Sequence, residues 1–311
     1  MKVEIGEVFE WLGTRHIATG CPRGTTVSGV LADINGKRDI PLQVRSMGAS
    51  KRKLWADNYK ANKHLMTRGI KELFGKKKGK CCIIAGSGPS LQVDYLRNFK
   101  SDKWDVIACN DAYRLIGGDY AYFIDGSDMP IMDKWVSNVR GKTKAILSWF
   151  VRPQMAHKGW ARTYWHGFWP RHLQTDADGN SDENIDVVDR LGGTWMALNV
   201  TAVAFDFAFQ AGYDTIAFVG CDFAFTNGMT HYNEPAVWND NFDYLVSEQM
   251  QGGLVLTRES LKMQANIHEA LAWFGTDAGR KVYNCTEGGI MFGDIECKPL
   301  AEVIGDDKCQ I

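Results

Sequence analysis

The feature that most constrains the fold is an alternation, from residue 80 onward, of short apolar segments with helix-like segments. The apolar segments have the length of buried strands and lie at 81–86, 104–110, 120–126, 144–150, 215–223 and 281–286. Segments with helical periodicity lie between them at 90–99, 199–212 and 261–275. Strands that are apolar on both sides are covered on both faces. The pattern therefore predicts an α/β fold with a mostly parallel sheet and helices on both faces.

Two regions depart from this alternation. Residues 1–53 mix short alternating segments with Gly and Pro, which predicts a small β-containing N-terminal extension before a main domain at 54–311. Within the main domain, 151–190 combines Arg, His and many aromatic residues before a stretch rich in Gly, Asp and Asn. A long insertion of this kind in a compact domain is typical of a lid or a binding loop. We therefore expect an aromatic and basic insertion at about 151–190.

Composition excludes several classes of protein. The 36 Lys and Arg nearly balance the 37 Asp and Glu, so no overall charge draws the chain to nucleic acid or to anionic lipid. The eight cysteines form no C-x-x-C pair and are predicted to be reduced and mostly buried. No apolar run reaches the roughly 20 residues of a membrane helix, and the first residues include acidic side chains where a secretion signal is basic. We expect a cytoplasmic protein without a membrane partner.

A glycine turn follows the first predicted strand of the main domain. Gly86, Ser87 and Gly88 come directly after "CCIIA", and Ser90 precedes the next predicted helix. Glycines at such a turn permit positive φ and let backbone amides approach an anion, while a serine can cap the helix or donate to a phosphate. The turn matches neither the P-loop nor the complete dinucleotide pattern. It predicts a phosphate cradle, with a strand-to-helix turn that binds nothing as an equal alternative.

Other predicted strands end in small or polar residues. Asn110 and Asp111 follow 104–109, Asp125 lies at 120–126, and Asp222 follows "AFVGC". A further pair, Asn199 and Thr201, stands where a helix begins. Because ligands of parallel sheets bind beyond the carboxyl ends of the strands, these residues favour a nucleotide site at one edge.

A histidine follows the last of these strand ends. His231 and Tyr232 lie in "CDFAFTNGMTHYNEP", so they are expected near the same edge. A histidine there can protonate a departing phosphate or deprotonate a hydroxyl, because its pKa lies near neutral pH. A histidine that only caps a loop explains the spacing equally well.

Taken in order, "IIAGSGPSL", "VIACNDAY", "AYFIDGSD", "NVTAVAFDFAFQAGY", "IAFVGCDFAFTNGMTHY" and "VYNCTEGGIMFG" resemble a known domain. It is shared by the motility-associated-factor (Maf) flagellin glycosyltransferases and the archaeal 6-hydroxymethylpterin diphosphokinases (MptE-like), and it is more distantly similar to bacterial sialyltransferases. The resemblance covers roughly residues 54–300. It implies a Rossmann-like transferase that binds a nucleotide-activated donor.

The resemblance also implies roles for single residues. His231 is implied as the general acid or base, with Asp222 orienting it or binding the donor. The implied donor contacts are Gly86, Ser87, Gly88, Ser90, Asn110, Asp125, Asn199, Thr201, Thr286 and Glu287. The chain departs from the family at Cys221, at the helix start "LNVT" and in the segment 151–175.

Two reactions fit the resemblance. Glycosyl transfer from a cytidine-monophosphate-linked nonulosonic acid or another nucleotide sugar to a hydroxyl is the leading expectation, and it needs no metal or other cofactor. ATP-dependent pyrophosphoryl transfer is the alternative, and it would need Mg²⁺ held by Asp111, Asp125 and Asp222. A nucleotide-binding protein without catalysis is a further alternative.

The acceptor is expected at the aromatic insertion. Arg162, Trp165 and Trp169, together with Tyr232, are the candidate acceptor contacts. Such aromatics stack on sugar rings, and interleaved with basic residues they also hold nucleic acid, so glycan, protein and nucleic acid acceptors stay open. A tryptophan-rich satellite core explains the same residues.

Overall fold

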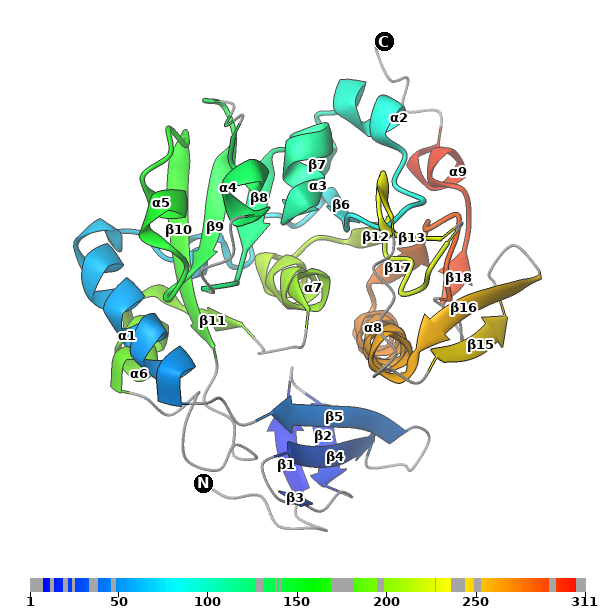
Figure 1. Ribbon diagram of the computed structural model, residues 1–311, viewed down its shortest axis with the longest axis horizontal. Coiled ribbons are helices and arrows are strands. Elements are labelled where there is room, and N and C mark those ends of the chain that lie inside the picture. The colour runs from blue at the N-terminus through cyan, green and yellow to red at the C-terminus, as the bar shows by residue number, and fades with distance from the viewer. Residues whose placement is uncertain are drawn as a thin grey trace.

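The computed structural model carries the whole chain. It describes residues 8–11, 14–18, 22–23, 26–33, 39–45, 49–126, 131–137, 139, 141–168, 182–194, 199–226, 228–235, 244–248, 253–290 and 295–305. Within these ranges, a small antiparallel sheet precedes a large parallel sheet with its helices (Figure 1).

The small sheet belongs to the first 45 residues. It contains five strands, β1 (Val8–Trp11), β2 (Thr14–Ala18), β3 (Pro22–Arg23), β4 (Thr26–Asp33) and β5 (Asp39–Arg45). All of its pairings are antiparallel, with β4 paired to β2, β3 and β5. The strands expected in the N-terminal extension are thus present, and helix α1 (Ala49–Asn62) begins shortly after them.

The large sheet has nine strands among the described residues, in the order β11-β10-β9-β8-β7-β6-β12-β17-β18. Their bounds are β6 (Cys81–Ala85), β7 (Trp104–Cys109), β8 (Tyr120–Phe123), β9 (Lys144–Ser148), β10 (Arg162–Phe168), β11 (Gly193–Thr194), β12 (Thr215–Val219), β17 (Lys281–Asn284) and β18 (Glu296–Cys297). Every pairing is parallel. The predicted α/β class is confirmed.

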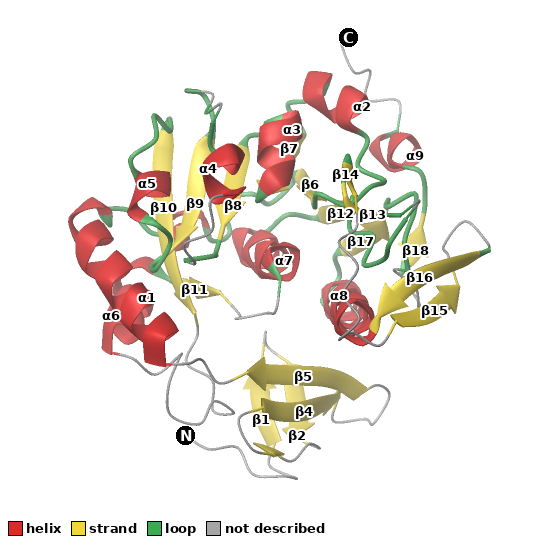
Figure 2. Cartoon of the chain, in the orientation of Figure 1, coloured by secondary structure: helices red, strands yellow, loops and turns green. Residues whose placement is uncertain are grey.

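Helices cover both faces of this sheet (Figure 2). They are α2 (Val93–Asn98), α3 (Asp111–Ile116), α4 (Ile131–Trp135), α5 (Pro153–Ala156), α6 (Asp182–Leu191), α7 (Val200–Ala211), α8 (Glu259–Asp277) and α9 (Leu300–Ile304), with short 3-10 turns at Lys63–Leu65 and Ile70–Leu73. Neighbouring residues of β8 contact opposite layers, since Tyr122 packs on Phe207 of α7 and Phe123 on Trp135 of α4. Both faces of the strand are therefore buried, as its apolar sequence requires.

The strand order reverses between β6 and β12. From β6 the chain proceeds to β7, β8, β9 and β10 on one side, and it later returns to lay β12 and β17 on the other. In open parallel sheets, ligands bind at the carboxyl ends of strands beside such a switch point. The glycine turn after β6 lies at this position.

The segment 151–190 is not an insertion throughout. Residues 162–168 form β10, which pairs in parallel with β9 and with β11. The expectation of a binding loop is therefore wrong for this part. The sequence misled because β10 is rich in Trp, Tyr and His, which pack in the interior here and are equally frequent in binding loops.

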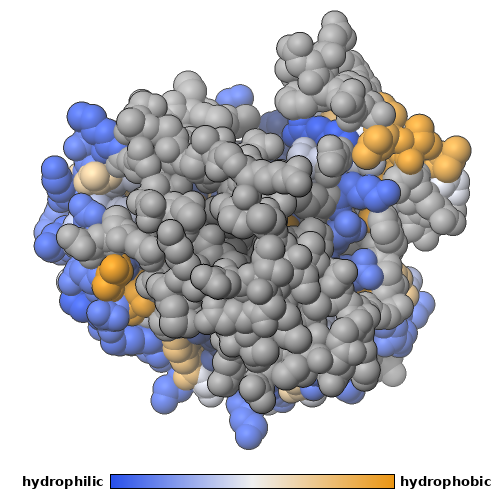
Figure 3. All heavy atoms as spheres, turned by 90° about the horizontal axis from the view of Figure 1, so that it is seen from below, coloured by the Kyte–Doolittle hydropathy of each residue, from blue (hydrophilic) through white to orange (hydrophobic). Residues whose placement is uncertain are grey.

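Two hairpins stand outside the large sheet. One pairs β13 (Met229–His231) with β14 (Glu234–Pro235), and the other pairs β15 (Tyr244–Glu248) with β16 (Leu254–Arg258). The second exposes Val246 and Leu254, on the side of the molecule where Figure 3 shows apolar surface. Among the described residues, no helix is both long and apolar enough to cross a membrane.

Candidate functional site

The glycine turn, residues 86–88, packs between the ends of β6 and β12. The amide of Gly86 donates to the Val219 carbonyl at 2.9 Å, and the amide of Gly88 donates to the Gly220 carbonyl at 2.8 Å. A Cβ on Gly86 would lie 2.5 Å from the Gly220 oxygen, and one on Gly88 would lie 2.0 Å from the Asp222 carboxylate. Neither Gly86 nor Gly88 has a positive φ. Glycine is required here for close packing of the two strand ends.

This packing differs from the expected phosphate cradle. The sequence predicts that the amides of Gly86 and Gly88 face a phosphate, whereas both donate to carbonyls that follow β12. The positive φ expected at these glycines is also wrong; the lack of room for a side chain is what requires glycine here. Ser87, between them, is partly exposed.

Asp222 holds segments of this edge together through hydrogen bonds. Its carboxylate accepts hydrogen bonds from the Ser90 amide at 3.2 Å, the Ser90 hydroxyl at 2.8 Å and the Thr226 hydroxyl at 3.3 Å. Only 2% of Asp222 is exposed, and burial raises its pKa. Because these hydrogen bonds satisfy the carboxylate and occupy Ser90, both residues hold the turn in place.

The late segment 284–290 wraps around the same aspartate. The hydroxyl of Thr286 accepts from the Cys221 amide at 3.2 Å, and the amide of Ile290 donates to the Asp222 carbonyl at 2.8 Å. Gly289 has a φ of +77°, and a Cβ there would lie 1.9 Å from the Asp222 oxygen. Thr286 is buried, whereas Glu287 is exposed and accepts from Gln92 at 2.6 Å. Of the two predicted contacts, Glu287 alone reaches solvent.

Of the residues that the structure describes, Asn110 is one of two at this edge with a strained backbone, the other being Phe223 with φ 50°. Asn110 follows β7 with φ 49° and ψ −124°, a conformation that residues other than glycine rarely adopt. Its side-chain oxygen is buried and has no hydrogen-bond partner among the described residues. A buried acceptor without a donor costs about 1–3 kcal/mol, which a ligand N–H or O–H would recover. This residue is the best-supported ligand contact among those predicted.

The neighbouring aspartates do not converge as metal ligands. Asp111 binds Arg114 through two hydrogen bonds of 2.6 and 2.7 Å, which also raise the pKa of the guanidinium. Asp125, after β8, is partly exposed, and Asp222 is held by Ser90 and Thr226. Across the described ranges, no group of three His, Cys, Asp or Glu side chains has a geometry that holds a metal ion. The three aspartates therefore do not form one joint ligand set.

Asn199 and Thr201 begin α7 at the same edge. The Asn199 side chain caps the helix by accepting from the Ala202 amide at 2.9 Å. The Thr201 hydroxyl lies 2.8 Å from the Nε2 atom of His268, a residue of α8 that the sequence argument missed. Both predicted donor contacts are thus engaged within the protein. The apolar spacing of residues 261–275 predicts a helix, but it does not predict that His268 contacts the start of another helix.

The hairpin β13–β14 brings His231 to the glycine turn. The amide of Tyr232 donates to the Ser87 carbonyl at 2.8 Å. The His231 side chain is 53% exposed, and its Nδ1 lies 3.8 Å from a carboxylate oxygen of Glu234. Since the Asp222 carboxylate bonds to Ser90 and Thr226, Glu234 is the acidic group beside His231, and the expectation that Asp222 orients it is wrong. The spacing H-Y-N-E across a two-residue turn is the signal that could have identified Glu234.

The predicted acceptor residues lie apart from this edge. Trp165 is 0% exposed in the core, so the expectation that it contacts an acceptor is wrong. Arg162 opens β10 and pairs in register with Lys144, the first residue of β9, at the opposite edge of the parallel sheet. Trp169 lies outside the described residues. Tyr232, partly buried against the core, is the one acceptor candidate beside the glycine turn.

Comparison with known proteins gives one solved structure. No protein-family model and no curated protein matches the chain. The structure of the Maf glycosyltransferase from Magnetospirillum magneticum AMB-1 matches with a TM-score of 0.51 and 14% sequence identity, over 79% of this chain. The match spans 38% of that protein, so this chain corresponds to well under half of its length. The chain therefore has the α/β fold found in part of the Maf glycosyltransferase.

Proposed function

We propose that the chain is a transferase that takes a nucleotide-activated donor at the carboxyl edge of β6, β7 and β12, and that it transfers a glycosyl group to a hydroxyl. The observation that carries this proposal is Asn110, which follows β7 with a strained backbone and has a buried side-chain oxygen without a partner among the described residues. Strain of this kind is kept at binding sites, where a ligand satisfies the group. An amino group of a nucleobase or a ribose hydroxyl supplies the missing donor.

The chemistry proposed for the edge needs one proton acceptor. As the acceptor oxygen bonds to the anomeric carbon, the bond from that carbon to the phosphate oxygen breaks and nucleoside monophosphate leaves. The hydroxyl proton passes to His231, and the carboxylate of Glu234 at 3.8 Å stabilises the resulting imidazolium. The solved glycosyltransferase with the same fold supports this reaction class. A cytidine-monophosphate-linked nonulosonic acid is the donor that we propose to test first.

Pyrophosphoryl transfer is the less favoured reading. It needs acidic ligands for Mg²⁺, and Asp111 is committed to a bidentate pair with Arg114. Glycosyl transfer is favoured because it uses the groups present at this edge and needs no set of metal ligands.

The test is an assay of the purified chain with a panel of nucleotide sugars and, separately, with ATP, Mg²⁺ and a pterin alcohol. Glycosyl transfer predicts release of the donor's nucleotide, which is cytidine monophosphate for a cytidine-monophosphate-linked sugar and a nucleoside diphosphate for a diphosphate-linked sugar. His231→Ala is expected to lower turnover about 100-fold or more, with the Kd for cytidine monophosphate unchanged within about twofold. His64→Ala, on the short turn after α1, is the control and is expected to keep full activity.

Three outcomes contradict the proposal. Release of AMP in the pterin assay identifies the diphosphokinase reaction, and nucleotide binding without turnover identifies a non-catalytic binding protein. Equal turnover in His231→Ala and the wild type removes His231 from the mechanism.

A further inference from the structure

The first turn of α7 is tied to α8 by a closed set of hydrogen bonds, which we call the α7–α8 network. It consists of Asn199, Thr201, Gln264 and His268. The Asn199 amide donates to the Gln264 side chain at 3.2 Å, and the Thr201 hydroxyl lies 2.8 Å from both the Asn199 side-chain oxygen and His268 Nε2. His268 Nδ1 lies 2.9 Å from the Gln264 carbonyl, which closes the set.

The network fixes the protonation of His268. Nδ1 faces a carbonyl oxygen, which only accepts, so Nδ1 carries the proton and Nε2 is the acceptor for the Thr201 hydroxyl. Burial lowers the pKa of His268 to about 4, so the ring is neutral at neutral pH. The Asn199 oxygen, 2.8 Å from the same hydroxyl, also accepts from the Ala202 amide, so the single hydroxyl proton of Thr201 has two acceptors within reach.

The network also contacts the segment that follows β12, next to the glycine turn. The ring centroids of His268 and Phe223 lie 4.7 Å apart. In the same segment, the Cys221 thiol lies 3.2 Å from the position that a Cβ on Gly86 would take. The segment after β12 therefore contacts both the network and the glycine turn.

We propose that His268 is a positioning residue that fixes the first turn of α7 relative to the glycine turn, at the edge where the nucleotide of the proposed function binds. The inference rests on the proposed function, because it assumes that a nucleotide occupies this edge. The α7 start and the glycine turn belong to different segments, so their relative position depends on the side chains that pack between them. A hydrogen-bonded network holds such a geometry before the ligand arrives, which reduces the ordering cost of binding.

The chain contains a matched control. His166 on β10 is also 0% exposed, its pKa is also lowered to about 4 by burial, and its Nδ1 lies 3.0 Å from the hydroxyl of Thr194. β10 is separated from β6 by β7, β8 and β9. The two histidines therefore share burial and a threonine partner, and they differ in distance along the sheet from the glycine turn.

The experiment compares His268→Phe with His166→Phe, and the milder Thr201→Val with Thr194→Val. Binding of cytidine monophosphate is measured by calorimetry, and stability by thermal unfolding. We expect both histidine variants to lower Tm, whereas only His268→Phe and Thr201→Val weaken binding, by about tenfold, as the loss of one ordering hydrogen bond predicts. Thr201→Ser, which keeps the hydroxyl, is expected to restore affinity to within about twofold. Equal affinity in Thr201→Val and Thr194→Val overturns the inference.

A second measurement separates this inference from the proposed function. Amide hydrogen exchange of residues 199–204 is recorded without ligand. Faster exchange there in Thr201→Val than in Thr194→Val supports the positioning role even when no nucleotide binds the wild type, a result that would overturn the proposed function alone. Equal exchange in the two variants rejects the positioning role.

Discussion

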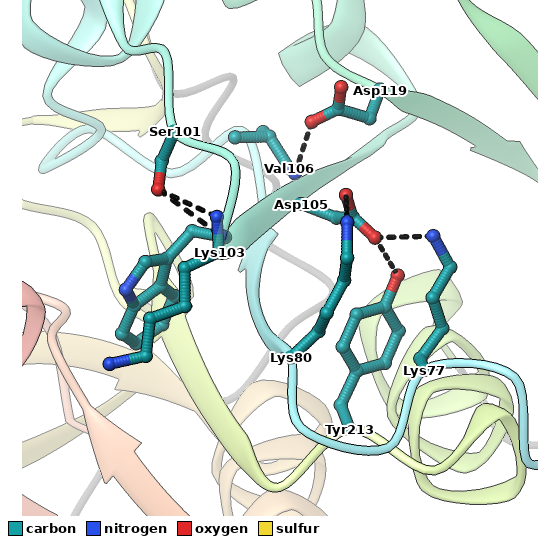
Figure 4. A network of polar contacts seen from close by, with 9 residues as sticks. Lys77, Lys80, Ser101, Lys103, Asp105, Val106, Asp119 and Tyr213 are labelled. Atoms are coloured by element: carbon teal, nitrogen blue, oxygen red, sulfur yellow. Dashed lines mark hydrogen bonds and ion pairs between the residues drawn. The ribbon is translucent and has the colours of Figure 1, made fainter.

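Asp105 and Asn110, at opposite ends of β7, are buried polar groups in opposite situations. At the amino edge the Asp105 carboxylate accepts from Lys77 at 2.6 Å and from the Tyr213 hydroxyl at 2.6 Å, with Lys80 at 3.9 Å (Figure 4). At the carboxyl edge Asn110 keeps a strained backbone and a buried oxygen without a partner. A buried charge with its partners contributes to a defined fold, whereas an unsatisfied group costs stability and gives a ligand something to bind. Trp104 and Tyr120, at the starts of β7 and β8, also carry buried polar atoms without a partner among the described residues, so the strained backbone is what distinguishes Asn110.

The largest effect is expected at the glycine turn. Gly88→Val places a branched side chain where even a Cβ would lie 2.0 Å from the Asp222 carboxylate, so the turn cannot close on β12. We expect loss of nucleotide binding and a stability loss of about 4 kcal/mol or more, measured by calorimetry and denaturant unfolding. The control is Gly141→Ala, where a Cβ meets nothing within 4 Å. A folded Gly88→Val protein with unchanged affinity for cytidine monophosphate would remove the turn from the site.

At the amino edge, Lys77→Met is expected to cost stability without affecting binding. It leaves the mostly buried Asp105 carboxylate without its closest cation, which costs about 3 kcal/mol. The control is Lys78→Met at the neighbouring exposed lysine, expected to change stability by less than about 0.5 kcal/mol. A loss of nucleotide affinity in Lys77→Met at full stability would contradict the separation of the two edges.

The buried histidines predict the direction of the pH dependence. His166 and His268 have folded-state pKa values of about 4, below the value of 6.5 for an unperturbed histidine, because burial disfavours the charged ring. Between pH 6.5 and 4 the unfolded chain binds more protons, so unfolding becomes easier as the pH falls, by about 3 kcal/mol for each histidine. Thermal unfolding across this range checks the prediction. His166→Phe and His268→Phe should each make the profile flatter, and an unchanged profile in both would contradict it.

The smallest effect is expected from relieving strain at the carboxyl edge. Asn110→Gly allows φ 49° without a side-chain clash and removes the buried oxygen. We expect a stability gain of about 1 kcal/mol in denaturant unfolding, together with weaker binding of cytidine monophosphate. Asn233→Gly, at φ 58° in the β13–β14 hairpin, is the control and should relieve strain without weakening binding. Equal nucleotide affinity in Asn110→Gly and the wild type would show that the strain serves no ligand.

Much of the architecture followed from local patterns. The strands that begin at Cys81, Trp104, Tyr120 and Thr215 were predicted because apolar runs of that length are buried on both faces. Helix α7 and its end at Gly212, whose φ is 94°, follow from the rule that glycine ends helices in the left-handed conformation. β10 was missed because its aromatic residues also suit a binding loop.

The site was predicted less completely, for a different reason. The sequence indicated which residues stand at strand ends, but not which hydrogen bonds they make. Ser90, Asp222, Asn199 and Thr201 were expected to face a donor, and each is occupied by another part of the chain. The partners of these residues lie far away in sequence, as Ser90 and Asp222 are 132 positions apart.

The sequence by itself determined the α/β class and much of the succession of strands and helices, and it is the basis for the hypothesis that a ligand binds at the carboxyl edge. These depend on hydrophobic periodicity and on the geometry of parallel sheets, which act over a few residues. Only the tertiary structure decided that Asn110 keeps an unsatisfied oxygen, that Glu234 accompanies His231, and that His268 supports α7. The reason is that hydrogen bonds are short and directional, so their partners are fixed only when distant segments pack together.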